Sequence, residues 1–443
     1  MAGGRQLIHI DLQAKQRLML DRTTAPGFGR IDTIDLIEPK VDHLDNGIPV
    51  FTVEDGLQEV QKVELIFPVG TVSSDKKLVA ATSVKQLTEG TSKKTSAEIA
   101  ESVDFFGAYL QTHVSHDDSS LELYTLNKHL EPTLDILAEV YSDPTFPQEE
   151  LLNHCLRGKQ EMLVNEEKVG YLGAKAFSAA LFGADRPYGC AAETTDYGKL
   201  KRTDIHAFHR EHLKRNIRHI IVSGRPAKET LNELNGHFGK EERMEPKAVD
   251  MTVDPGSKRS VHVLKEDAVQ NGIRMGRVMF NRTHPDFVGM QILATVLGGY
   301  FGSRLMRNIR EDKGYTYGIG AAMVSMQHSG YLSISAEVGA EVCRAALHEI
   351  DLELEKLRRD PVPIDELELV RNYMLGSILK SLDGPFAIAS KWKNYLKYGI
   401  GRSAHEDLIR QIKTVTPEHL LSLSNMYLQT EDLTTVTVGR PLS

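Results

Sequence analysis

Two side chains in this sequence, Arg310 and Tyr317, have types and a spacing that would let them act together. A guanidinium is a rigid fork of N–H donors, and a phenol adds an O–H donor. Placed side by side, the two could donate hydrogen bonds to one carbonyl oxygen. The alternative is a plain corner between a helix and a strand with a solvated arginine, and the spacing by itself leaves that alternative open.

The residues around this pair indicate the elements that would position it. An apolar, arginine-rich stretch predicts a helix from about Ser303 to Asp312, and Gly314 is its stop signal. Alternating side chains from Tyr315 onward predict a strand that returns past the helix end. Three glycines precede the helix and would permit a left-handed backbone at little steric cost: Gly298, Gly299 and Gly302.

Residues 298–318 resemble the second-domain signature of the insulinase and mitochondrial-processing-peptidase family of zinc peptidases. In that signature a glycine-rich loop and Ser-Arg-Leu precede an Arg-Glu-x-x-Gly-x-x-Tyr run, and the resemblance covers roughly Val41 to Arg440. It implies that Arg310 and Tyr317 bind the substrate backbone opposite the zinc. It also implies a mobile, substrate-facing loop at the three glycines, although they could equally be the turn chemistry of the corner.

The resemblance further implies a zinc motif, HxxEH, on a helix in the first half of the chain. There two histidines bind the metal and the glutamate is the general base. Counting back from Gly90-Thr91, the motif positions hold Ala81, Val84 and Lys85 instead, and HxxEH occurs nowhere in the chain. An ammonium group is only a donor and would repel zinc, so we expect no metal on this chain.

Other possible metal ligands are few. Glu166 or Glu167 could match the family's third ligand, but one carboxylate cannot hold a catalytic zinc. Three histidines recur every third residue on a predicted helix, where they would spread over about 120° of its surface. Weak chelation by the first two is the alternative to a solvated helix face: His206, His209 and His212.

The two halves of the sequence repeat the same order of elements. Strand, helix, Asp-Pro and helix follow one another around Asp143-Pro144 and again around Asp360-Pro361, and similar strands end at Arg225 and Arg440. Both repeats are about 215 residues apart, which favours a duplicated domain over chance similarity. We therefore predict two similar α+β domains, each a mostly antiparallel sheet with helices on one face, forming half of a clamshell. The predicted boundaries are an arm at 1–40, domains at 41–238 and 261–443, and a linker at 239–260.

Composition limits the class of protein. The net charge of -8 and the lack of a basic block argue against a nucleic-acid partner. No apolar run is long enough to cross a membrane, and charged residues interrupt the start of the chain where a secretory signal would lie. We expect a cytoplasmic protein, although a trimmed secretory signal would leave the same sequence. Three widely separated cysteines suggest no disulfide framework.

Together these features predict a non-catalytic, substrate-binding subunit of a heterodimeric zinc metallopeptidase that cleaves peptides. Its partner would be a homologous chain that carries HxxEH and holds the zinc, and the chain alone would lack peptidase activity. The alternative is a non-proteolytic scaffold with the same fold. Arg310 and Tyr317 favour the peptidase role, because a scaffold has no need of them.

Overall fold

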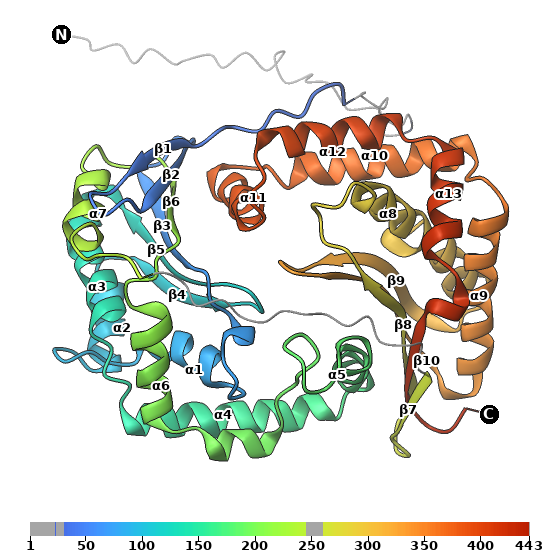
Figure 1. The fold of residues 1–443 in the computed structure, drawn as a ribbon, viewed down its shortest axis with the longest axis horizontal. Coiled ribbons are helices and arrows are strands. Elements are labelled where there is room, and N and C mark those ends of the chain that lie inside the picture. The colour runs from blue at the N-terminus through green and yellow to red at the C-terminus, as the bar shows by residue number, and fades with distance from the viewer. Residues whose placement is uncertain (1–22, 24–30, 245–259, 443) are drawn as a thin grey trace, which may run out of the picture. The chain divides into compact units, whose positions relative to one another are not determined.

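The computed structural model describes residue 23, residues 31–244 and residues 260–442, and Figure 1 shows the arrangement of their elements. Most of the predicted arm and of the predicted linker therefore lies outside the described residues. Two β-sheets organise one unit that begins at Ile34. No described helix is long and apolar enough to span a lipid bilayer.

The first sheet has six strands in the order β1-β2-β6-β3-β5-β4. Its pairs are antiparallel except β2 with β6, which run parallel. Val63, Leu65 and Phe67 alternate along β3 and belong to one core, while the residues between them are buried on the opposite face of the sheet. The strands are β1 (Lys40–His43), β2 (Pro49–Glu54), β3 (Val60–Phe67), β4 (Tyr109–Val114), β5 (Ser119–Leu126) and β6 (His219–Gly224).

The second sheet repeats the first. Its order is β7-β11-β8-β10-β9, again with one parallel pair, β7 with β11. These five strands match β2-β6-β3-β5-β4 in order and direction, so the predicted pair of similar, mostly antiparallel domains is confirmed. The strands are β7 (Ser260–Leu264), β8 (Gln270–Met279), β9 (Thr316–Ser325), β10 (Gly330–Gly339) and β11 (Thr434–Gly439).

Gly224 and Gly439 end the equivalent strands β6 and β11. Both have positive φ, 108° and 138°. A Cβ on Gly224 would lie 2.3 Å from the carbonyl oxygen of Val60, and one on Gly439 would lie 2.1 Å from Oδ1 of Asn271. A side chain is excluded at both positions, which explains why the Gly-Arg strand ending occurs in both halves.

Helices flank both sheets, and most of those predicted from sequence are present. Thr95 and Glu98 form a capping box at the start of α2. The described α-helices are α1 (Val79–Lys85), α2 (Ser96–Phe105), α3 (Leu130–Ser142), α4 (Gln148–Glu166), α5 (Val169–Phe182), α6 (Arg202–Phe208), α7 (Thr230–Phe238), α8 (Phe287–Ala294), α9 (Cys343–Arg359), α10 (Ile364–Lys380), α11 (Pro385–Lys397), α12 (Arg402–Thr414) and α13 (Pro417–Tyr427).

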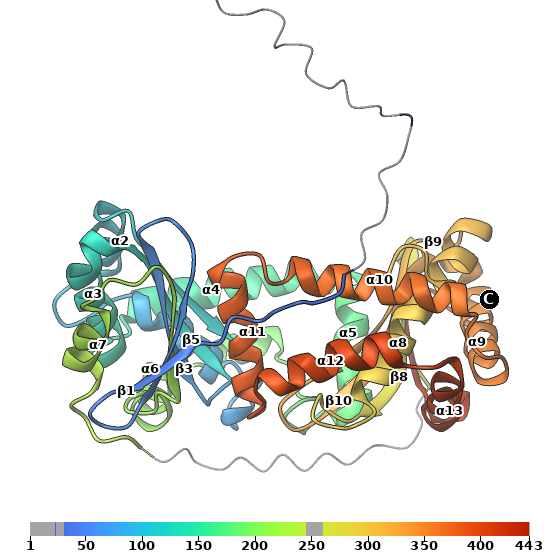
Figure 2. The same ribbon diagram turned by 90° about the horizontal axis from the view of Figure 1, so that it is seen from above.

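One helix of each half packs against the sheet of the other half. Phe177 and Leu181 of α5 share a buried cluster with Val436 and Val438 of β11, in the second sheet. Conversely, α11 packs on the first sheet, where Trp392 and its neighbours contact strands β2, β3 and β6. Figure 2 shows both helices away from the sheet of their own half. The sequence predicted helices on one face of each sheet, and this exchange adds a helix to the second face.

A buried charge cluster fixes α11 to the first sheet. The ammonium of Lys393 lies 3.1 Å from Glu64 and 3.2 Å from Glu122, and Lys62 lies 3.0 Å from each of the same carboxylates. Burial by itself would raise the pKa of Glu122, but Lys393 and Lys62 hold it well below its ordinary value. Four mutually paired charges therefore replace an apolar contact between helix and sheet.

Candidate functional site

Arg310 lies on a short helix, Met306–Asp312, whose hydrogen bonding is that of a π-helix rather than the predicted α-helix. Such widened turns are rare and often occur at functional sites. Gly314 follows with φ +65°, the left-handed conformation expected of a helix stop. Position and end of the predicted helix are thus confirmed, and its internal geometry differs.

Polar contacts hold this π-helix against α9 and α10. Arg304 donates from Nε and Nη2 to the two carboxylate oxygens of Glu366, at 2.9 and 2.8 Å. Asn308 donates to Glu349 at 3.0 Å and to Glu353 at 2.8 Å. A two-point arginine–carboxylate contact fixes orientation as well as distance, so the helix is held in one rotational setting.

Arg310 is half-buried, and the contact of its guanidinium is with an aromatic ring. Its Cζ lies 4.6 Å from the centre of the Phe301 ring, a cation–π distance. Among the described residues no carboxylate pairs with Arg310 and no acceptor takes a hydrogen bond from its side chain. The donor fork is therefore positioned by a ring that uses none of its N–H groups.

Tyr317 lies on β9, at the edge of the second sheet, and 89% of its surface is exposed. Its neighbour Thr316 fixes the local backbone. The Thr316 hydroxyl donates a hydrogen bond to the carbonyl of Glu337 at 2.6 Å and accepts one from the Gly318 N–H at 3.0 Å. These bonds accompany a register shift between β9 and β10. Within the described chain the phenol hydroxyl of Tyr317 has no hydrogen-bond partner.

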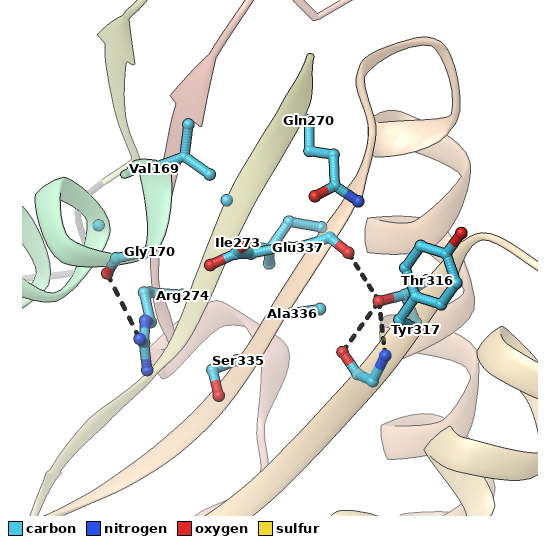
Figure 3. Close-up of a pocket in the computed structure, with 13 residues that line it drawn as sticks. Val169, Gly170, Gln270, Ile273, Arg274, Thr316, Tyr317, Ser335, Ala336 and Glu337 are labelled. Carbon is cyan, nitrogen blue, oxygen red and sulfur yellow. Dashed lines mark hydrogen bonds between the residues drawn. The ribbon is translucent and has the colours of Figure 1, made fainter. Parts of the chain in front are cut away.

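Tyr317 also lines a pocket of about 330 Å³ where the start of α5 meets the second sheet. Figure 3 shows Thr316 and Tyr317 on one side of this pocket and Gly170 and Arg274 on the other. Arg274 donates weakly to the carbonyl of Gly170, at 3.5 Å. Arg310 does not line the pocket. The structure thus places both predicted residues at the π-helix and the strand that follows it, each with unused donors, but with different immediate surroundings.

The glycines differ from the sequence prediction. None of Gly298, Gly299 and Gly302 has a positive φ among the described backbone angles, so left-handed backbone is not their role. Gly298 is a buried residue of a π-helical turn, Thr295–Gly299, and a Cβ there would lie 2.5 Å from the backbone nitrogen of Ala321. A Cβ on Gly302 would lie 2.9 Å from the Tyr300 ring. Close packing therefore explains Gly298 and Gly302.

In the first half, the three zinc-motif positions lie on α1, as predicted. Val84 is buried in the core of the first sheet, Lys85 is exposed, and Ala81 lines a cavity of about 600 Å³. A methyl group, an isopropyl group and an ammonium supply no lone pair for a metal. The side chains present at these positions do not fit zinc.

The surroundings of α1 reinforce this conclusion. Thr82 Oγ1 contacts Nε2 of His154, on α4, at 3.3 Å. Burial, together with the positive charges of Lys85 and Arg157, lowers the pKa of His154, while Glu161 opposes them. A cation at this place would meet two positive side chains, which disfavours metal binding.

The glutamates considered as third ligands have other partners. Glu166 lies 3.5 Å from Lys175, and Glu167 lies 2.7 Å from Lys265. Glu166 is the last residue of α4 and Glu167 follows it, whereas the acidic residue that acts electrostatically on His154 is Glu161.

Two family models match the sequence. The model described as Insulinase (Peptidase family M16) matches residues 59–183, and that described as Peptidase M16 inactive domain matches residues 199–374. Together they cover more than half of the chain.

The chain belongs to the M16 peptidase family. A zinc protease YmxG of Bacillus subtilis, named as uncharacterized, is 26% identical over 346 residues, which are 78% of this chain and 84% of that protein. A protein of Helicobacter pylori named non-peptidase homolog YmxG is 24% identical over 400 residues, 87% of this chain and 90% of that one.

Solved M16 structures share the fold. The M16 inactive domain structure from Pseudomonas fluorescens has a TM-score of 0.82 and 22% identity, covering 91% of this chain and 99% of the other. A Helicobacter pylori protease structure has a TM-score of 0.81 and 20% identity, covering 91% and 100%. The M16 fold thus spans both sheets and their exchanged helices.

Within this M16 chain, residues 31–244 and 260–442 contain no group of three or more His, Cys, Asp or Glu side chains able to hold a metal ion. The histidine series has structural contacts instead. His209 donates from Nε2 to the carbonyl of Tyr141 at 2.8 Å, and His206 packs edge-on against Phe146 with ring centres 4.9 Å apart. Burial lowers the pKa of His209 to about 4, so the ring is neutral at physiological pH.

Sequence reasoning missed Phe301, which supports Arg310, and Glu337, which lines the pocket beside Tyr317. A weak signal existed for both. Phe301 is an apolar residue between predicted turn glycines, where burial is not expected, and Glu337 is charged on an otherwise uncharged strand. The pocket itself had no local signal, because its other wall is the exchanged helix α5.

Proposed function

We propose that this chain is the non-catalytic, substrate-binding subunit of a heterodimeric zinc metallopeptidase that cleaves peptides. One observation carries the proposal: Arg310 is held in place with its donors unused, while the zinc-motif positions supply no metal donor. A chain that could bind the peptide but holds no metal would need a second chain to supply the zinc. The partner would be a homologous M16 chain with HxxEH, which would hold zinc and supply the general base.

In this role the chain binds and orients the peptide. Arg310 would donate to a substrate carbonyl from its fork, and the exposed hydroxyl of Tyr317 would donate to the same stretch of backbone. Backbone contacts of this kind are independent of side-chain sequence, so they fix the position of the peptide rather than its identity. Gly298 and Gly302 would set the wall of the substrate site by allowing close packing.

A scaffold role without proteolysis is the second candidate. The name of the Helicobacter pylori relative, a non-peptidase homolog, favours it. A scaffold would not use the donors of Arg310 or Tyr317, so the two roles differ in what these residues do.

Reconstitution tests the proposal. The chain is co-expressed with an M16 homologue that carries HxxEH, the mixture is separated by size-exclusion chromatography, and cleavage of an unfolded peptide is measured. We expect a one-to-one complex more active than the homologue alone, and less than one zinc per chain in chelator-washed, zinc-reloaded protein purified by itself. A persistent monomer with no gain in activity on mixing would favour the scaffold.

A further inference from the structure

Contacts with α10 fix residues 299–300, which precede the helix of Arg310. The Tyr300 ring lies against the Tyr373 ring of α10, with centres 5.2 Å apart, and the Tyr373 hydroxyl donates to the carbonyl of Gly299 at 3.3 Å. Ser303 N–H also closes a turn onto the carbonyl of Tyr300, at 3.1 Å. Phe301 stands between these two anchors, so its backbone has little freedom.

Phe301 nevertheless leaves 60% of its surface exposed. The contact that accounts for its placement is the guanidinium of Arg310, 4.6 Å from the ring centre. A cation–π contact uses the face of the ring and leaves the N–H groups of arginine available to an oxygen acceptor. A carboxylate in the same place would occupy those groups.

We propose that Phe301 is a positioning residue that holds the Arg310 guanidinium toward a bound peptide without consuming its donors. The proposal deepens the proposed function and rests on it. An arginine side chain has several rotatable bonds, and fixing it before the peptide arrives removes an entropic cost of binding. Phe301 acts through Arg310, so its effect on binding disappears when Arg310 is absent.

The first experiment needs no peptide. Wild type, Phe301→Leu and Phe301→Trp react with phenylglyoxal, and the modification of Arg310 is followed by mass spectrometry, with the exposed Arg307 on the same helix as internal control. Losing an exposed cation–π contact frees the guanidinium by about two- to fivefold. We expect Arg310 to react faster by that factor in Phe301→Leu and no faster than wild type in Phe301→Trp. Equal rates in all three proteins would overturn the proposal.

The second experiment is a double-mutant cycle on peptide binding, measured by fluorescence anisotropy of fluorescein-labelled oxidised insulin B chain. We expect Phe301→Leu to weaken peptide binding about two- to fivefold and Phe301→Trp to bind as wild type does. In the Arg310→Ala background, Phe301→Leu should weaken binding no further. If Phe301→Leu weakens binding equally in both backgrounds, the ring contacts peptide directly and the positioning role is wrong.

The two experiments separate this inference from the proposed function. If Arg310→Ala weakens binding and Phe301→Leu does not, the proposed function stands and the role of Phe301 falls. If wild type binds no peptide, or Arg310→Ala binds it as well as wild type, the proposed function fails and the positioning role with it, whatever the phenylglyoxal rates show.

Discussion

Replacement of Arg310 should impair catalysis by the assembled pair while leaving the chain folded. A charged hydrogen bond to a substrate carbonyl contributes about 1.5–3 kcal/mol, which corresponds to about a tenfold to hundredfold loss of kcat/KM for Arg310→Ala. Arg310→Lys should be nearly as harmful, because an ammonium does not reproduce the planar fork. Tyr317→Phe removes only a neutral donor, and we expect a loss of several-fold.

The contacts of Arg310 and Tyr317 also predict how much stability each variant loses. The contact that Arg310 makes is an exposed cation–π pair, so its loss removes only about 0.5–1 kcal/mol, and Tm should fall by no more than a few degrees. Tyr317 is 89% exposed and its hydroxyl has no described partner, so Tyr317→Phe should melt like wild type. A large loss of activity with a small loss of stability is therefore the signature of substrate binding.

The assay is kcat/KM of the reconstituted heterodimer on an unfolded peptide, with thermal melts of each variant. Arg307→Ala is the matched control, since Arg307 is an exposed arginine on the same π-helix, and it should leave both quantities unchanged. Because Arg310 and Tyr317 would hold one peptide backbone, their effects should not simply add. Wild-type kinetics in both Arg310→Ala and Tyr317→Phe would refute the reasoning and leave a helix–strand corner in a scaffold.

Three further predictions concern stability. Lys393→Met leaves two buried carboxylates with one ammonium and should cost about 2–4 kcal/mol in urea unfolding, whereas the exposed Lys380→Met should be neutral; equal midpoints would show that the cluster contributes nothing. Gly298→Ala forces a Cβ to 2.5 Å from backbone and should cost about 1–3 kcal/mol, while Gly376→Ala, with open space in α10, should stabilise; a neutral Gly298→Ala would mean that the backbone yields easily. His209 has a pKa of about 4 in the folded chain against 6.5 ordinarily, so the stability that its neutral ring contributes is present above pH 6.5 and is lost as pH falls toward 4. Over this pH range Tm should therefore fall less steeply in His209→Gln than in wild type. An equally steep fall in both proteins would contradict the assignment.

Much of the fold could be predicted because its signals are local. Alternating side chains from Tyr315 onward predicted β9, and the repeated Asp-Pro stretches and similar strand ends predicted the duplication. The exchange of α5 and α11 could not be predicted, since an amphipathic helix pattern says which face is buried and not which sheet buries it. Likewise the π-helical geometry at Arg310 follows from its tertiary contacts rather than from residue preference.

The candidate site was predicted in part for the same reason. The types and order of residues placed Arg310 on a helix and Tyr317 on the next strand. The lack of metal donors at Ala81, Val84 and Lys85 followed directly from the residue types at these positions. The glycine prediction was wrong about φ because glycine also serves close packing, and one sequence does not distinguish the two uses. Contacts that join distant segments, such as Glu337 near Gly170, had no sequence signal.

The packing of α5 against the second sheet also determines when, during synthesis of the chain, its apolar face can be buried. Phe177 and Leu181 find their apolar partners on β11, the last described strand, which the ribosome reaches about 250 residues after it has made α5. At about 5–20 residues per second, that delay is roughly 10–50 s. Throughout it the apolar face of α5 lacks β11, one of the two strands that it packs against most. The buried cluster shared by α5 and β11 is thus completed only after β11 has been made, and until then α5 offers chaperones an exposed apolar surface.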